Sequence, residues 1–180
     1  MCANTGGPLT NQQQECFMAT ADITAALLRE LFHYDPDTGV FTRLVRTSNN
    51  CKLGPSGMLT KRGSVAVSVC GKKRAAHRLA WLYMTGEWPA DEIDHIDGDQ
   101  TNNRFANLRE CSGAENKQNM RRARRGNKSG FLGVSRHQGQ WQARIHMGGK
   151  VKRLGLFKTP EEAHLAYVAA KRQLHPFGVL

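Results

Sequence analysis

The sequence has no long run of apolar residues and no closely spaced pair of cysteines. No stretch approaches the ~20 apolar residues that a membrane-spanning helix needs, and the polar N-terminus lacks the charged start and apolar core of a secretion signal. The five cysteines are scattered and none stand as Cys-x-x-Cys, so no pattern indicates structural zinc or a framework of disulfides. We therefore expect a cytoplasmic protein with reduced thiols and no membrane partner.

Acidic residues are scarce in the last part of the chain. Residues 112–180 hold 14 Lys and Arg but only three Asp and Glu, whereas residues 1–111 hold 12 of each kind. The whole net charge of +11 therefore lies after residue 111. Because such a surface repels itself until a polyanion neutralises it, nucleic acid is the first partner to consider. The alternatives are a solubility surface and an anionic lipid, although no long amphipathic basic helix supports the lipid.

Hydrophobic spacing in the first part predicts alternating helices and strands. We expect a helix over 22–32, a strand over 40–45, a loop over 47–62 and a strand over 65–69. A second helix follows, with His77 on its apolar face as a hydrogen-bonded core histidine. Residues 92–120 then read as a strand, a polar loop, a strand and a helix that begins with a Ser112–Glu115 capping box.

The C-terminal part predicts a small antiparallel sheet packed on one helix. Three short strands are expected over 131–136, 140–147 and 150–157, with Gly148-Gly149 as a hairpin turn. A helix then starts at Thr159, which forms a capping box with Glu162. Alternation along the second strand places the basic side chains on the face away from the helix.

Polar residues around Asp94-His95 suggest hydrolysis of a phosphodiester, which needs a proton acceptor for water and a stabilised phosphate. Taken singly, each residue could equally be an ordinary turn, cap or surface residue. Together the residues resemble the HNH nuclease family, in its phage homing-type branch, over roughly residues 22–120. The matching text is Asp94-His95-Ile96-Asp97-Gly98-Asp99, Asn103-Arg104, Asn107-Leu108-Arg109, Asn116 and Asn119.

This resemblance implies a ββα-metal fold and a set of site residues. Asp94 and Asn116 would bind one divalent ion, Mg²⁺ or Mn²⁺, through hard oxygen donors. His95 would activate water, and Asn107 would orient His95 by hydrogen bonding. Asn116 stands where the family often has a final histidine, and its neutral amide is a weaker ligand.

The C-terminal stretch, about 127–175, resembles the plant ethylene-response-factor DNA-binding domain. The resemblance rests on Ser129-Gly130-Phe131-Leu132-Gly133-Val134, Trp141-Gln142-Ala143-Arg144-Ile145, Leu154-Gly155-Leu156-Phe157 and Glu161-Glu162-Ala163. A small antiparallel sheet of the kind expected here fits a DNA major groove. Leu132 and Ser135 replace arginines that often read bases there, so no target sequence follows. The residues expected to contact DNA are Arg121, Arg122, Arg124, Arg125, Arg136, Arg144, His146 and Arg153.

The sequence therefore predicts an α+β protein, a monomeric HNH endonuclease that nicks double-stranded DNA and has no small-molecule substrate. The expected parts are a disordered tail (1–21), a nuclease module (22–120), a basic linker (121–128) and a DNA-binding domain (129–180). The main alternative is a DNA-binding regulator whose nuclease module is inactive. An RNA-binding or nucleoid protein is a third class, disfavoured by the few aromatics available for stacking in the basic part.

Overall fold

The computed structural model describes residues 23–47, 51–121, 123 and 126–178. The N-terminal tail expected over 1–21 lies outside the described residues. The chain divides into two compact units, which we describe separately. The first unit runs to His95 and includes Asp99–Arg109, and the second consists of Ile96–Gly98 and everything from Glu110 onward.

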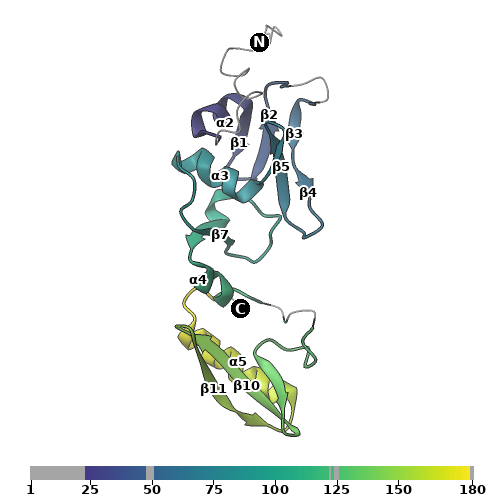
Figure 1. Ribbon diagram of the computed structural model, residues 1–180, viewed down its shortest axis with the longest axis vertical. Helices are drawn as coiled ribbons and strands as arrows, with labels where there is room; N and C mark the ends of the chain where they lie inside the picture. Colours follow the sequence, from purple (N-terminus) through teal and green to yellow (C-terminus); the bar gives the residue numbers. More distant parts are fainter. Residues whose placement is uncertain (1–22, 48–50, 122, 124–125, 179–180) are drawn as a thin grey trace. The chain divides into compact units, whose positions relative to one another are not determined.

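The first unit is built from small antiparallel sheets and two helices (Figure 1). Two three-stranded sheets have the orders β1-β2-β3 and β4-β5-β6, and β7 pairs with β8. The helices are α2 (Ala25–Leu31) and α3 (Ala76–Thr85), and a 3₁₀ turn, η1, spans Phe105–Asn107. The strands are β1 (Phe32–Asp35), β2 (Val40–Arg43), β3 (Gly54–Ser56), β4 (Met58–Leu59), β5 (Val65–Val69), β6 (Lys72–Ala75), β7 (Glu92–His95) and β8 (Leu108–Cys111).

One hydrophobic core joins all parts of this unit. Its members come from α2, from both three-stranded sheets, from α3 and from the β7–β8 pair. Both helices and both three-stranded sheets thus bury apolar side chains in one shared core, as a stable domain requires. The fully buried members include Leu28, Phe32, Val67, Leu79 and Leu82.

Sequence patterns located most of these elements but missed four strands, β1, β3, β4 and β6. The strand over 65–69, the helix α3 with Gly86 in the left-handed conformation at its end, and the strands β7 and β8 are confirmed. The expected loop over 47–62 is wrong in part, because β3 and β4 lie within it. The predicted helix ends at Leu31, and Phe32 begins a strand whose side chains alternate between buried and exposed. Strand β6 was also missed, because its Lys-Lys-Arg run resembles a turn and not a strand.

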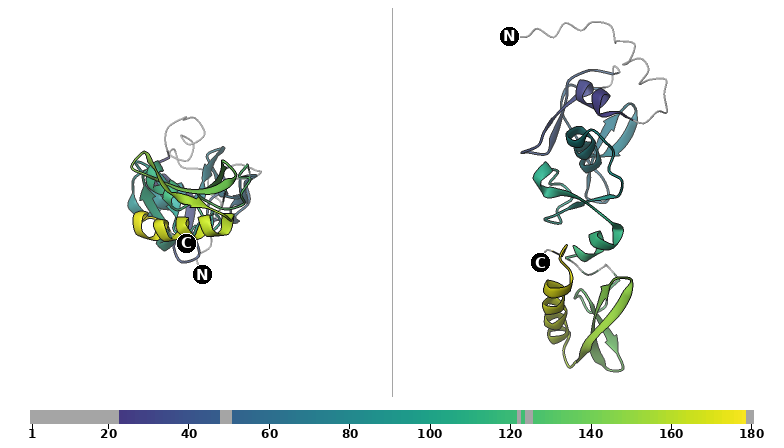
Figure 2. Two further views of the ribbon diagram at one scale, coloured as in Figure 1. Left: turned by 90° about the horizontal axis from the view of Figure 1, so that it is seen from below. Right: turned by 90° about the vertical axis from the view of Figure 1, so that its left-hand side faces the viewer.

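The second unit contains a three-stranded antiparallel sheet in the order β11-β10-β9 and two helices. In the right-hand view of Figure 2, α5 lies along one face of this sheet, and none of the described elements of the unit covers the other face. The elements are α4 (Gly113–Gln118), β9 (Val134–His137), β10 (Gln140–Met147), β11 (Lys150–Phe157) and α5 (Pro160–Leu174). The expected sheet packed on one helix is confirmed, as are both capping boxes.

Close packing holds α5 against the sheet and against the segment after α4. Gly133 has a φ of +76°, and a Cβ at this position would lie 2.0 Å from the Tyr167 ring on α5. Lys171 is fully buried, and its ammonium donates to the backbone carbonyl of Met120 at 2.7 Å. Burial, with a smaller effect of Arg121, lowers the pKa of Lys171.

The α+β class is thus confirmed, with small antiparallel sheets and four described α-helices. Within the described residues, no helix has the length and apolarity to cross a membrane.

Candidate active site

Strand β7 carries the two residues on which the predicted site depends. Asp94 and His95 are only 7% and 5% exposed, at the end of a strand whose Ile93 packs into the core. Burial of a carboxylate and an imidazole is costly unless each has polar partners. The partners of the two side chains come from different elements, because successive strand residues point to opposite faces.

The carboxylate of Asp94 forms an ion pair with Arg109 on β8. Arg109 donates from Nε at 3.1 Å and from Nη2 at 2.8 Å, both to Oδ2 of Asp94. Charge-assisted bonds of this kind are stronger than neutral ones. The site therefore presents an anionic oxygen group in fixed orientation. Arg109 belongs to the quoted motif, but its pairing with Asp94 was not predicted.

The imidazole of His95 lies against the side chain of Asn103, in the polar loop between β7 and β8. His95 Nε2 and Asn103 Oδ1 are 3.2 Å apart, and Asn103 is only 2% exposed. The amide of Asn107, which was expected to orient His95, donates to the carbonyl of Asn102 at 2.8 Å. Asn107 thus supports the loop next to Asn103, the residue whose side chain meets the histidine.

A second histidine, His77 on α3, completes the surroundings of His95. The two rings meet edge to face with 5.0 Å between their centroids. Burial, together with His95 and Arg78, lowers the pKa of His77 to about 4, so its ring is neutral near pH 7. The expected core hydrogen bond is not found at Nδ1, which is buried without a partner in the described part of the chain. His77 therefore packs against the candidate base.

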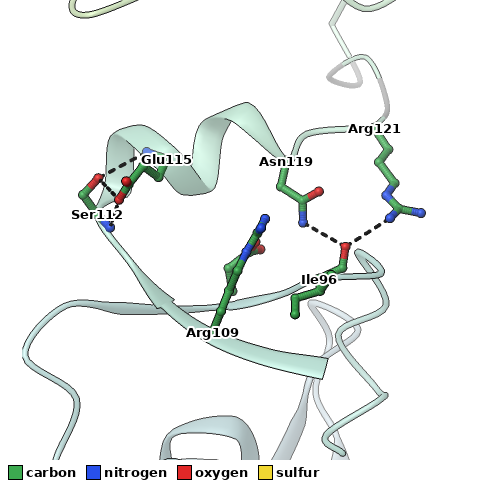
Figure 3. A network of polar contacts seen from close by, with 7 residues as sticks. Ile96, Arg109, Ser112, Glu115, Asn119 and Arg121 are labelled. Atoms are coloured by element: carbon green, nitrogen blue, oxygen red, sulfur yellow. Dashed lines mark hydrogen bonds and ion pairs between the residues drawn. The ribbon is translucent and has the colours of Figure 1, made fainter. Parts of the chain in front are cut away.

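In the second unit, α4 carries Asn116, the other predicted metal ligand. The helix begins at a capping box formed by Ser112 and Glu115. At its end, Asn119 and Arg121 both donate to the backbone carbonyl of Ile96, at 3.4 and 3.1 Å (Figure 3). The segment that follows Asp94-His95 is thus attached to the residues that follow α4.

The residues expected to contact DNA are distributed over both faces of the C-terminal sheet. Arg144 and Arg153 are opposite each other on β10 and β11, and both are exposed. His146 is also exposed and is paired with Val151. Arg136 is paired with Trp141 and lies 5.1 Å from the centre of that ring, on the side of the sheet that packs on α5. Arg122, Arg124 and Arg125 lie outside the described residues.

The open face is both basic and partly apolar. Val151 is 50% exposed and Leu156 is 47% exposed, and they stand on the same face as Arg144 and Arg153. Arginines with interspersed apolar groups suit a DNA groove, where the methyl group of thymine gives an apolar contact. Arg121, in contrast, is engaged with the backbone of Ile96 and packs beside Gly98.

The donor set limits which metal this site could hold. Among the described residues, no group of three or more His, Cys, Asp or Glu side chains could hold an ion. A single buried carboxylate suits Mg²⁺ or Mn²⁺, which keep several waters and take further ligands from substrate phosphate. It does not suit zinc, which requires three or four protein ligands.

Comparison with known proteins places an HNH endonuclease domain at residues 74–118, where the HNH endonuclease family model matches. This segment contains α3, β7, β8 and α4, and thus the motif residues from Asp94 to Asn116, whereas Asn119 lies just beyond it. It identifies a nuclease domain of the HNH type, and DNA is the substrate that such a domain implies. No curated protein and no solved structure matches the chain.

Proposed function

We propose that this protein is a metal-dependent endonuclease that cuts one phosphodiester bond of duplex DNA. The observation that carries the proposal is a buried histidine, next to an ion-paired aspartate, inside the segment that matches the HNH endonuclease family. A surface histidine in a chance match would not be held by a buried amide, as His95 is by Asn103. The proposal therefore rests on the match and the geometry together.

In the proposed reaction, His95 accepts a proton from a water molecule as the water oxygen attacks phosphorus. A new P–O bond forms and the bond to the 3′ oxygen breaks. The departing oxygen takes a proton from solvent, which leaves a 3′-hydroxyl and a 5′-phosphate. Because the neighbouring His77 is neutral, no positive charge at that ring opposes proton transfer to His95.

A divalent ion, when bound, would stabilise the charge that develops on the phosphate and on the departing oxygen. Asp94 would hold it through a carboxylate oxygen, and Asn116 on α4 would add an amide oxygen. Arg109 binds the same carboxylate and so sets the orientation of Asp94. With only one charged ligand, we expect weak binding of the ion until the DNA phosphate contributes.

We further propose that the open face of the C-terminal sheet positions the enzyme on DNA. Arg144, Arg153 and His146 would meet phosphates or base edges, and Val151 and Leu156 would add apolar contacts. A chain with one such motif has one scissile phosphate, so a monomer would nick a single strand.

Incubation of the purified protein with supercoiled plasmid, with and without Mg²⁺ or Mn²⁺, tests the proposal. Open circles should appear only with metal, and linear DNA only late. His95→Ala should lose cleavage by about 100-fold or more with little change in DNA affinity. The matched control is His33→Ala, an exposed histidine on β1 that should cut normally. Tight DNA binding without cleavage by the unaltered protein would instead favour a regulator with an inactive nuclease module.

A further inference from the structure

The buried side chain of Asn103 determines which nitrogen of His95 carries the proton. The Nδ2 amino group of Asn103 donates to the carbonyl of Thr101 at 3.1 Å. This bond fixes which end of the amide is which, so Oδ1 faces His95 Nε2 at 3.2 Å. An amide oxygen only accepts, and therefore Nε2 must be the protonated nitrogen. The lone pair of a neutral His95 then lies on Nδ1, the atom that would take the proton from water.

Asn103 is itself held by the β1–β2 hairpin, far away in the sequence. The hydroxyl of Tyr34 on β1 donates to the backbone carbonyl of Asn103 at 2.7 Å, and Tyr34 is only 1% exposed. The backbone amide of Phe105 donates to the carbonyl of Pro36 in the hairpin turn at 3.0 Å. These two bonds fix the loop on both sides of Arg104.

The turn of the β1–β2 hairpin packs against the backbone of the loop that carries Asn103, with no space for a side chain at Gly39. Gly39 closes the hairpin turn with a φ of +74°. A Cβ at Gly39 would lie 2.4 Å from the carbonyl carbon of Asn103 and 2.6 Å from the backbone nitrogen of Arg104. Real Cβ atoms do not approach backbone atoms this closely, so any other residue at position 39 would displace the loop. The hairpin therefore packs closely against the backbone of Asn103 and holds it in place.

We propose that Asn103 is the positioning residue of His95, and that the β1–β2 hairpin holds Asn103 in place through the Tyr34 hydroxyl. Asn103 keeps the Nε2–H tautomer and fixes the ring plane, so that Nδ1 faces the reacting water. This role rests on the proposed nuclease function, in which His95 is the base. The tautomer itself can be measured without any cleavage.

The first test measures the His95 tautomer by ¹⁵N NMR of the full chain, at pH about 8, where an ordinary histidine is neutral. The His95 signals are identified by their loss in His95→Gln. The unaltered protein should show the proton on Nε2. Asn103→Leu, which keeps the branched shape of the side chain and removes the acceptor, should give a mixture of the two tautomers, and Asn103→Asp should retain Nε2–H. A proton found on Nδ1 in the unaltered protein would overturn the proposal.

The second test compares kcat and KM for plasmid nicking. Asn103→Leu should lower kcat by about 10- to 100-fold with KM nearly unchanged, because the base is misoriented while DNA binding is intact. Asn103→Asp should recover most of this loss, since it still accepts from Nε2–H. An Asn103→Leu variant that cuts at the normal rate would refute the positioning role.

The third test concerns the hairpin and avoids any change in packing. Tyr34→Phe removes only the hydroxyl and keeps the ring against Phe41, 4.7 Å away between centroids. We expect a fall in kcat of about 3- to 10-fold and partial loss of the Nε2–H tautomer. The control is Tyr83→Phe, which removes a hydroxyl from the same aromatic cluster and should change neither. Equal effects of both substitutions would refute a specific role for Tyr34.

The positioning role of Asn103 and the proposed nuclease function can be refuted separately. If the unaltered protein does not cut DNA but Asn103→Leu still disturbs the tautomer, the positioning role stands and the nuclease function falls. If the protein cuts DNA and Asn103→Leu alters neither tautomer nor kcat, the nuclease function stands and the positioning role falls.

Discussion

The pair of arginines on the open sheet face should affect stability and DNA binding in opposite directions. Arg144 and Arg153 stand directly opposite each other on β10 and β11. Like charges in this arrangement destabilise a sheet by roughly 0.2–1 kcal/mol. Arg144→Gln should therefore raise the free energy of unfolding by about 0.5 kcal/mol. For a small unit this corresponds to a melting temperature roughly 2–4 °C higher, measurable by circular dichroism.

The same substitution should weaken binding to duplex DNA. Under the proposed function, Arg144 neutralises one phosphate, so its loss should reduce the slope of log affinity against log salt by about 0.9. A fourfold rise in salt would then reduce the affinity of the variant about 3.5-fold less than that of the unaltered protein. Fluorescence anisotropy of a labelled duplex over a salt series measures this slope.

The control for both measurements is Arg172→Gln, which removes the same charge from the last turn of α5. Helix α5 covers the other face of the sheet, so the salt slope should not change. The melting temperature should not rise either, because a positive charge in the last turn stabilises a helix. If Arg144→Gln changes neither slope nor melting temperature, the two arginines neither repel one another nor contact DNA.

Two further predictions concern the folded state alone. Folding lowers the pKa of His77 from 6.5 to about 4, so between these values the unfolded chain binds a proton that the folded chain does not. The contribution of His77 to the free energy of unfolding should be fully present above pH 6.5 and should fall by roughly 2 kcal/mol toward pH 4, allowing for solvent screening. Urea unfolding should show a smaller loss in His77→Phe. An equal loss in both proteins would contradict the assignment. Gly133→Ala should destabilise the second unit by about 3 kcal/mol or more, because its Cβ would overlap the Tyr167 ring; a thermal melt matching that of the unaltered protein would show that the contact is absent.

Helices and strands with strong local patterns could be predicted from the sequence, whereas the missed strands depend on long-range pairing. The capping boxes of α4 and α5 are local signals and were located at the right residues. Strand β6, in contrast, consists largely of exposed basic residues, and its extended form depends on pairing with β5. Strand β3 is similarly a Gly-Pro-Ser segment that becomes a strand only beside β2.

In the candidate site, too, some residues could be predicted from a local pattern, whereas others are brought together only by the fold. Asp94 and His95 could be found by their spacing in the motif, and they lie within the matched segment. The side chains that contact these residues could not be predicted from the sequence. The loop contains several asparagines, and only the fold shows that the side chain of Asn103 is the one that lies against His95. The contact of His77 with His95 likewise joins residues 18 positions apart on different elements.

The shared core of the first unit limits how the HNH-type domain could be moved into a fusion protein. The matched segment begins at residue 74, yet its core residues Leu79, Ile93 and Leu108 pack in one cluster with Leu28 and Phe32. A piece cut at the boundaries of the match would expose these side chains and would also lose the hairpin that supports Asn103. A fragment that folds on its own must therefore begin before Thr24, the residue that caps α2, so the smallest portable form of this domain is larger than its recognisable motif.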